Sequence, residues 1–90
     1  MTFTYPVIVT PRGDGFHAEL PDLEGCYADG ADLSEALEAV RREAEEWIRI
    51  EMTEFEGDLP FASHPDDLTL SEGQFVRMAL IPYKLLPDND

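Results

Sequence analysis

The segment that decides the fold runs over residues 20–37 and reads LPDLEGCYADGADLSEAL. Its first half is rich in turn-forming residues, because Pro21 and Gly25 interrupt one extended run and Asp29-Gly30 forms a second turn soon afterwards. Only a short strand, at residues 26–28, fits between these two turns. The first half of the segment therefore predicts a brief strand with a turn on each side.

The second half of the segment contains a helix start signal. Asp32-Leu33-Ser34-Glu35 reads as a capping box, in which the Asp32 carboxylate accepts from the N3 amide and Glu35 bonds back to the amide of the cap. Gly57 is a plausible left-handed cap at the other end. Between them, apolar residues at spacings of three and four form one stripe that predicts a helix covering a sheet: Leu33, Ala36, Leu37, Val40, Ala44, Trp47, Ile48, Met52 and Phe55.

Both flanks of this segment alternate with the period of two that is typical of strands. Residues 3–10 form the first predicted strand and residues 16–20 the second, joined by the turn Pro11-Arg12-Gly13-Asp14-Gly15. Pro6 lacks a backbone donor, so either the regular pairing of the first strand begins after it or one side of the ladder is open there. Residues 74–83 form the fourth strand, and because both of its faces are apolar we expect it to be buried on both sides.

The predicted element order is β-β-β-α-β, and the fold class is α+β. A helix between the third and fourth strands, with a long connection, suits a mixed four-stranded sheet that contains one parallel pairing. One helix can cover only one face of this sheet. The other face carries Val76, Met78 and Leu80, or the residues that alternate with them, and would expose apolar surface. We therefore predict a homodimer or higher oligomer with its interface at these three residues.

Length and composition indicate one globular domain over residues 1–90, with a loop at 57–73 and a short polar tail at 84–90. A single cysteine excludes an intrachain disulfide and fits a reducing compartment. The amino terminus has no basic region, and no stretch approaches the length of a membrane span. We therefore expect a cytoplasmic protein without contact to a membrane.

The charge balance restricts the class of partner. The chain has 20 Asp and Glu residues against 6 Lys and Arg residues, a formal net charge of −14. Direct binding of nucleic acid is disfavoured, because that affinity comes from basic side chains, whereas basic proteins are attracted. Codon bias or a high-salt habitat is the alternative explanation. The candidate partner-binding carboxylates surround the helix entrance and follow the outer helix face: Asp22, Glu24, Asp29, Asp32, Glu35, Glu38, Glu45 and Glu46.

The run Leu20-Pro21-Asp22-Leu23-Glu24-Gly25-Cys26, followed by Asp29-Gly30 and Leu33-Ser34-Glu35-Ala36-Leu37, resembles the signature of HicB-like antitoxins of toxin–antitoxin pairs. The resemblance covers about residues 3–83. It implies a partial RNase H-like fold and a partner that is a small basic HicA-like toxin, an mRNA interferase held inactive by the antitoxin. Many such antitoxins carry a further DNA-binding segment. Nothing follows Asp90, so we expect no binding of DNA by this chain.

The resemblance and the charge together predict an antitoxin that neutralises a HicA-like toxin by direct binding and by occluding its RNA-binding and catalytic surface. This function requires no cofactor and no enzymatic activity. The first alternative is a stand-alone oligomeric binding module without a toxin partner. The second is a metal-dependent RNase H-like nuclease, which would need several carboxylates that converge on divalent metal ions.

Single residues give little support to the nuclease alternative. The first strand has no acidic residue, and His17 and His64 lie in different elements without metal-ligand spacing, so we predict no catalytic and no metal-binding residue. We expect Cys26 to be a small buried packing residue rather than a nucleophile. Trp47 belongs to the apolar stripe and is expected in the core, although partial exposure would make it an interface anchor.

Overall fold

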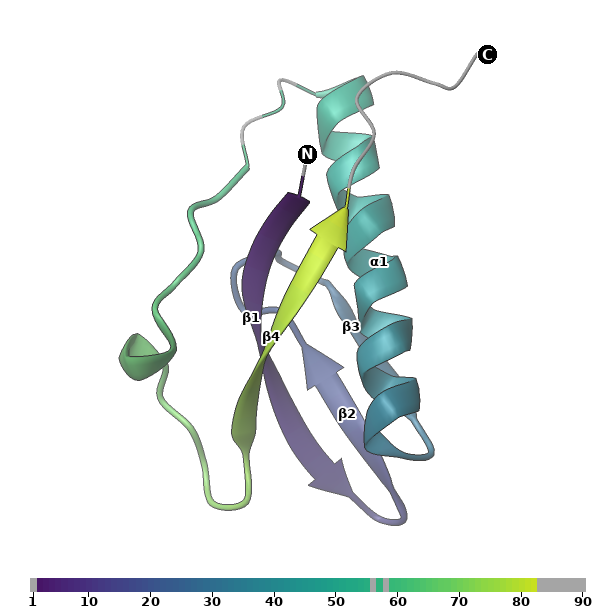
Figure 1. Cartoon of the computed structure of the whole chain (residues 1–90), viewed down its shortest axis with the longest axis vertical. Helices are drawn as coiled ribbons and strands as arrows, with labels where there is room; N and C mark the ends of the chain where they lie inside the picture. The colour runs from purple at the N-terminus through teal and green to yellow at the C-terminus, as the bar shows by residue number, and fades with distance from the viewer. Residues whose placement is uncertain (1, 56, 58, 83–90) are drawn as a thin grey trace.

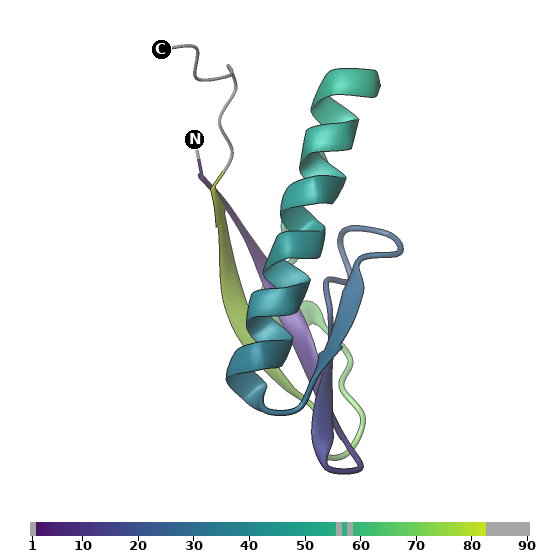
Figure 2. The ribbon, with the colours of Figure 1, turned by 90° about the vertical axis from the view of Figure 1, so that its right-hand side faces the viewer.

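The expected order of elements is present in the computed structural model, which describes residues 2–55, 57 and 59–82. The elements are β1 (Thr2–Arg12), β2 (Gly15–Glu19), β3 (Tyr27–Gly30), α1 (Leu33–Glu54), the short 3-10 helix η1 (Pro65–Asp67) and β4 (Phe75–Pro82). The four strands form one sheet in the order β3-β2-β1-β4, with α1 packed on one face (Figures 1 and 2). The predicted α+β class and the single covering helix are therefore confirmed.

All three strand pairings are antiparallel, so the expected mixed sheet with one parallel pairing is wrong. The reason lies in the connection between α1 and β4. α1 returns the chain along the sheet, and residues 59–74 then run back along its length before β4 begins (Figure 1). Two reversals instead of one make β4 antiparallel to its neighbour β1, with Phe3 opposite Ile81 and Val9 opposite Phe75.

The core lies between α1 and the sheet face formed by alternate residues of the strands. Tyr5, Val7 and Val9 of β1 share this face with Ala18 and with the buried residues of the turn after β2. The stripe of α1 predicted from the sequence supplies the other side, and its residues Ala36, Val40, Ala44 and Ile48 are fully buried. Cys26 is also buried in this core, as expected.

The position of β4 at the edge of the sheet contradicts the expectation that both of its faces are buried. Ile81 is fully buried and Phe75 and Ala79 pack against the core, so the alternate residues face away from α1. Of these, Met78 is 46% exposed and Leu80 is 61% exposed. An edge strand has a neighbour on one side only, which leaves these side chains without cover.

The helix start follows the predicted capping box. The Glu35 amide donates to the Asp32 carboxylate at 2.8 Å, while Glu35 Oε1 accepts from the amide of Ala31 at 2.7 Å. The helix ends at Glu54. The C-cap is Phe55, so the helix ends two residues before the predicted cap; Gly57 has the expected positive φ of 76° and donates its N–H to the carbonyl of Glu51.

Two details of the prediction are wrong at the ends of elements. Phe55 was placed on the apolar stripe, but it is the C-cap residue and is 66% exposed, because α1 extends beyond the ends of β1 and β4 (Figure 2). The third strand runs from Tyr27 to Gly30 rather than over residues 26–28, because Gly30 pairs with Phe16 of β2. The predicted loop at 57–73 contains η1, and the predicted tail at 84–90 lies outside the described residues.

The pairing around Pro6 decides between the two alternatives that the sequence left open, namely strand pairing that begins after Pro6 or one open side of the ladder. Pro6 pairs with Met78 of β4, whereas the pairing of β1 with β2 begins only at Ile8. The amino-terminal half of β1 therefore has a strand on one side and none on the other, and Pro6 lies where no donor is needed. The described part of the chain contains no helix that combines the length and the apolar character of a transmembrane segment.

Candidate partner-binding surface

The carboxylates predicted to surround the helix entrance are held by contacts within the chain. Asp32 and Glu35 form the capping box. Asp29 Oδ1 lies 2.8 Å from His17 Nδ1, and Glu19 lies 3.4 Å from the other ring nitrogen. Each of these side chains therefore has a structural role, whatever it contributes to the field at the surface.

Asp22 is also engaged, and its neighbour Glu24 is exposed. The Asp22 carboxylate accepts from the backbone amide of Ser63 at 2.9 Å and from the Ser63 hydroxyl at 2.6 Å. The Trp47 indole donates to the backbone carbonyl of Glu24 at 2.9 Å. Trp47 is half-buried and packs against the core, so its indole N–H fixes the turn after β2 onto α1.

The outer face of α1 carries carboxylates and guanidinium groups in alternation. Arg41 bonds Glu38 and Glu45, each at 2.6 Å, and Arg49 pairs with Glu46. The hydrogen bond and charge of Arg41 hold the pKa of Glu38 below its ordinary value, and the hydrogen bond from Arg49 does the same for the pKa of Glu46. The negative charges of the predicted contact residues Glu38, Glu45 and Glu46 are thus partly neutralised by arginines of the same helix.

The end of α1 differs from its middle, because its carboxylates have no basic partner in the described part of the chain. The last turn contains no basic residue, and among the described residues no basic side chain lies within 4.0 Å of the Glu51 or Glu54 carboxylate. The carbonyl end of a helix carries a negative partial charge of its own. This end of α1 therefore favours a cation from outside the chain.

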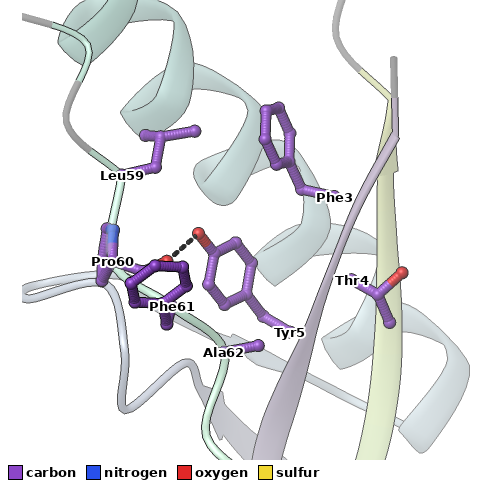
Figure 3. A pocket seen from close by; sticks show the side chains of 7 residues that line it. All are labelled: Phe3, Thr4, Tyr5, Leu59, Pro60, Phe61 and Ala62. Atoms are coloured by element: carbon purple, nitrogen blue, oxygen red, sulfur yellow. Dashed lines mark hydrogen bonds between the residues drawn. The ribbon is translucent and has the colours of Figure 1, made fainter.

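Two phenylalanines that follow α1 in the chain are exposed. Phe55 directly follows α1, and Phe61, which is 97% exposed, follows in the connection to β4. Phe61 lines a hollow of about 280 Å³ with Phe3, Tyr5 and Leu59, beside the free side of β1 (Figure 3). The Tyr5 hydroxyl donates to the carbonyl of Pro60 at 2.7 Å and holds this part of the connection in place.

We call Glu51, Glu54 and Phe55 the acidic-aromatic end. The sequence analysis did not select any of these residues as a contact. Phe55 was assigned to the core by its spacing, and the glutamates were indistinguishable from the paired ones along α1. The available signal was the run from Glu51 to Gly57, in which acidic residues accumulate at the carbonyl end of the helix without a basic residue.

The two histidines have local roles. His17 lies between the carboxylates of Asp29 and Glu19, and its ring is 5.6 Å from the ring of Tyr27. His64 Nδ1 accepts from the amide of Asp66 at the start of η1. The residues described here contain no group of three or more His, Cys, Asp or Glu side chains arranged to hold a metal ion.

A second feature is a groove between α1 and the edge strand. Leu37 and Arg41 of α1 line it together with Met78, Ala79 and Leu80 of β4, and its volume is about 390 Å³. Two of the residues predicted for an oligomer interface, Met78 and Leu80, are therefore accessible at the edge of the sheet. Val76, the third, is half-buried on the same strand face.

Comparison with known proteins identifies the family. No family model matches the chain. A UPF0150 protein of Synechocystis sp. strain PCC 6803 is 38% identical over 50 residues, which are 54% of this chain and 68% of that protein. The chain belongs to the HicB-like family, UPF0150. The resemblance seen in residues 20–37 is thereby confirmed.

The HicB-like fold also appears in solved structures. A chain of the toxin–antitoxin complex from Streptococcus pneumoniae superimposes with a TM-score of 0.69 at 22% identity, covering 91% of this chain and 70% of that one. A chain of the HicA3 and HicB3 toxin–antitoxin complex gives 0.63 at 23% identity, covering 91% and 99%. The HicB3 antitoxin gives 0.59 at 22% identity, covering 89% and 61%. At these identities the likeness establishes the fold.

Proposed function

We propose that this HicB-like chain is an antitoxin, which neutralises a small basic HicA-like toxin by binding it directly. The chain has the fold of proteins found in toxin–antitoxin complexes, and almost all of the described chain takes part in that likeness. Its net charge of −14 is complementary to a basic partner. Occlusion of the toxin's RNA-binding and catalytic surface accounts for neutralisation without any catalytic step on this chain.

The observation that carries this proposal is the acidic-aromatic end, whose carboxylates have no basic partner within residues 2–55, 57 and 59–82. Glu51 and Glu54 add to the negative end of α1, and a basic protein would supply the missing cations. Phe55, which directly follows α1, offers exposed aromatic surface at this end, and Phe61 exposes a second ring in the connection to β4. Aromatic anchors supply much of the affinity of an interface, whereas complementary charge mainly raises the association rate.

The carboxylates selected from the sequence have a different part in this proposal. Four of them already have hydrogen-bond or ion-pair partners within the chain: Asp22, Asp29, Asp32 and Glu35. Three others have basic neighbours on α1: Glu38, Glu45 and Glu46. All seven carboxylates therefore contribute to the long-range electrostatic field rather than to an anchoring contact with the toxin. Glu24 is exposed and can approach a partner directly. The field of the whole set steers a cationic toxin towards the domain, and its strength falls as salt is added.

The test is reconstitution with the small basic protein encoded beside this chain, if the locus contains one. We expect the two proteins to co-purify and the chain to suppress RNA cleavage by the partner. The double variant Glu51→Lys with Glu54→Lys should weaken binding by at least about tenfold, and Phe61→Ala should mainly speed dissociation.

The matched control is Asp14→Lys with Glu72→Lys, which changes the charge equally at exposed positions in two other turns. We expect this control to lower the association rate modestly and to leave the dissociation rate unchanged. A chain that neither binds a basic neighbour nor protects RNA from it would contradict the antitoxin proposal. That result would favour the stand-alone binding module.

A further inference from the structure

β3 is an outer strand of the sheet, and part of its backbone is not hydrogen-bonded. It pairs with β2 alone, on the side of the sheet opposite β4. The amide of Leu20 donates to the carbonyl of Cys26 at 3.0 Å, so the even-numbered residues bond across this ladder. The amides and carbonyls of Tyr27 and Asp29 therefore point away from the sheet, and no residue in the described ranges bonds to them.

The side chains of this edge lie on the sheet face opposite α1. Cys26 and Ala28 pack in the core, so the alternate residues Tyr27 and Asp29 point away from it. Tyr27 is 58% exposed, and Asp29 is exposed as well. A strand added to this edge would therefore place every second side chain beside Tyr27 and Asp29.

The charge of this edge is negative, unlike that of the other outer strand. Asp29 is the single charged residue of β3, whereas Arg77 is the single charged residue of β4. Asp29 and Glu19 contact the two ring nitrogens of His17. Each carboxylate makes this contact through one oxygen, and its second oxygen has no partner in the part of the chain that the structure describes.

Two further carboxylates lie at the start of β3. Glu24 is exposed in the turn that precedes the strand. Glu43 of α1 lies close enough to Cys26 that its charge adds to the effect of burial in raising the pKa of that thiol. Within residues 2–55, 57 and 59–82, neither carboxylate has a basic side chain within 4.0 Å. The surroundings of the β3 edge thus attract a basic segment and repel an acidic one.

We propose that an extended basic segment of the partner protein pairs with β3 as a fifth strand of the sheet. This inference rests on the antitoxin proposal, because it assigns a binding mode to the same basic toxin. Strand addition to a free edge anchors an extended segment through backbone hydrogen bonds, and the neighbouring side chains select its sequence. Here the free backbone groups of Tyr27 and Asp29 supply the anchor, and the carboxylates around them select Lys or Arg.

The alternation of side chains in a strand defines the segment that fits. A Lys or Arg directly beside Asp29 reaches its carboxylate, because cross-strand neighbours on one face have Cβ atoms about 4.5–5.5 Å apart. The residue two positions along the segment then lies beside Tyr27, where a second Lys or Arg places its charge over the exposed ring. We therefore expect a segment in which basic residues occupy every second position.

The test measures the hydrogen exchange of individual amides by NMR, with and without the basic protein encoded beside this chain. The amides of Tyr27 and Asp29 should exchange at least about tenfold more slowly in the complex, because they become hydrogen-bonded. The amide of Glu72, in the turn before β4, is the control and should exchange at an unchanged rate. A complex that protects RNA while both β3 amides exchange as in the free chain would overturn this inference and leave the antitoxin proposal intact.

A matched pair of variants separates the backbone from the charge. Asp29→Asn and Asp29→Pro both remove the carboxylate, but only proline also removes the outward N–H, which an edge strand tolerates. Asp29→Pro should therefore bind the partner at least about tenfold more weakly than Asp29→Asn. Thermal unfolding of both variants verifies that they are folded. Equal affinities of the two folded variants would contradict strand addition at β3.

A synthetic peptide tests the edge without the natural partner. The probe is a heptapeptide of alternating Lys and Thr with blocked ends, and its control is the same peptide with every backbone amide N-methylated, which keeps the charge and removes the donors. At low salt and millimolar concentration, only the unmethylated peptide should slow exchange at Tyr27 and Asp29. Equal effects of the two peptides, or none from the unmethylated one, would overturn the inference, whereas absence of a natural complex would count against the antitoxin proposal alone.

Discussion

The Asp22 carboxylate accepts two hydrogen bonds from Ser63, one from its amide and one from its hydroxyl, across 41 residues of sequence. These bonds join the turn after β2 to the connection between α1 and β4. A third bond, from the Tyr5 hydroxyl to Pro60, holds the same connection beside the free side of β1. The long connection is therefore fixed to the sheet at defined points, and these points position Phe61 at the hollow beside β1.

Asp22→Ala should destabilise the fold by about 1.5–3 kcal/mol, because the variant loses two hydrogen bonds to a charged acceptor. Urea unfolding followed by circular dichroism measures this change. Ser63→Ala added to Asp22→Ala should have little further effect, since both substitutions remove the same contact. Glu24→Ala, in the same turn but exposed, is the control and should change stability only slightly. Fully additive effects of Asp22 and Ser63 would show that they do not interact.

Gly30→Ala should destabilise the fold by about 1–3 kcal/mol or more, because a Cβ atom at Gly30 would lie 2.3 Å from the amide nitrogen of Ala36. The contact is with backbone, so a rotamer change cannot relieve it. Gly13→Asn is the control: Gly13 has a φ of 58° and open space around it, and asparagine tolerates that conformation. Comparable losses in thermal stability for the two variants would contradict the close approach of β3 to α1.

Arg41→Gln should change how stability depends on pH in acid. Arg41 lowers the pKa of Glu38 in the folded state, so this ion pair stabilises the fold above the unfolded pKa of Glu38 and its contribution is lost as pH falls through the folded pKa. The difference in unfolding free energy between wild type and variant should therefore shrink between about pH 5 and pH 3.

The control for this pH series is Arg12→Gln, which removes an exposed arginine for which no ion pair is present among the described residues. Its difference from wild type should stay nearly constant over the same range. A constant difference for Arg41→Gln as well would mean that the ion pair of Arg41 with Glu38 does not form in solution.

Cys26 should react slowly with thiol reagents in the folded protein. Burial, with a smaller contribution from the charge of Glu43, raises the pKa of the Cys26 thiol to about 11. The thiolate fraction at pH 8 is then at least about 100-fold below that of an ordinary cysteine, in addition to the loss of access. Labelling with a maleimide should accelerate on unfolding in urea. Rapid labelling of the native chain would show that the turn after β2 opens readily.

Features that depend on neighbouring residues could be predicted from the sequence. The capping box of Asp32 and Glu35 and the left-handed conformation of Gly57 just beyond the C-cap follow from the backbone requirements of a helix end. The alternation in β1 and β2 and the stripe of α1 follow from the periods of strand and helix. The family signature in residues 20–37 is of the same kind, because it combines turns with a helix start.

Features that depend on distant residues were predicted poorly. The predicted parallel pairing was wrong because the path of a long connection is not encoded in any local period, and the antiparallel pairing of β4 with β1 depends on the whole chain. The carboxylates Asp22 and Asp29 looked like free contact residues, since nothing near them in sequence reveals Ser63 or His17 as a partner. Phe55 matched the helical stripe, yet α1 is longer than the sheet that it covers.

The sequence by itself thus determined the elements, the helix boundaries, the family and the excess of negative charge, because each rests on residue type and short-range spacing. Only the tertiary structure decided which strand lies at the edge of the sheet, which carboxylates already have partners, and which have no basic partner among the residues described. Those properties arise when segments far apart in the chain meet, and packing, rather than local preference, selects which segments they are.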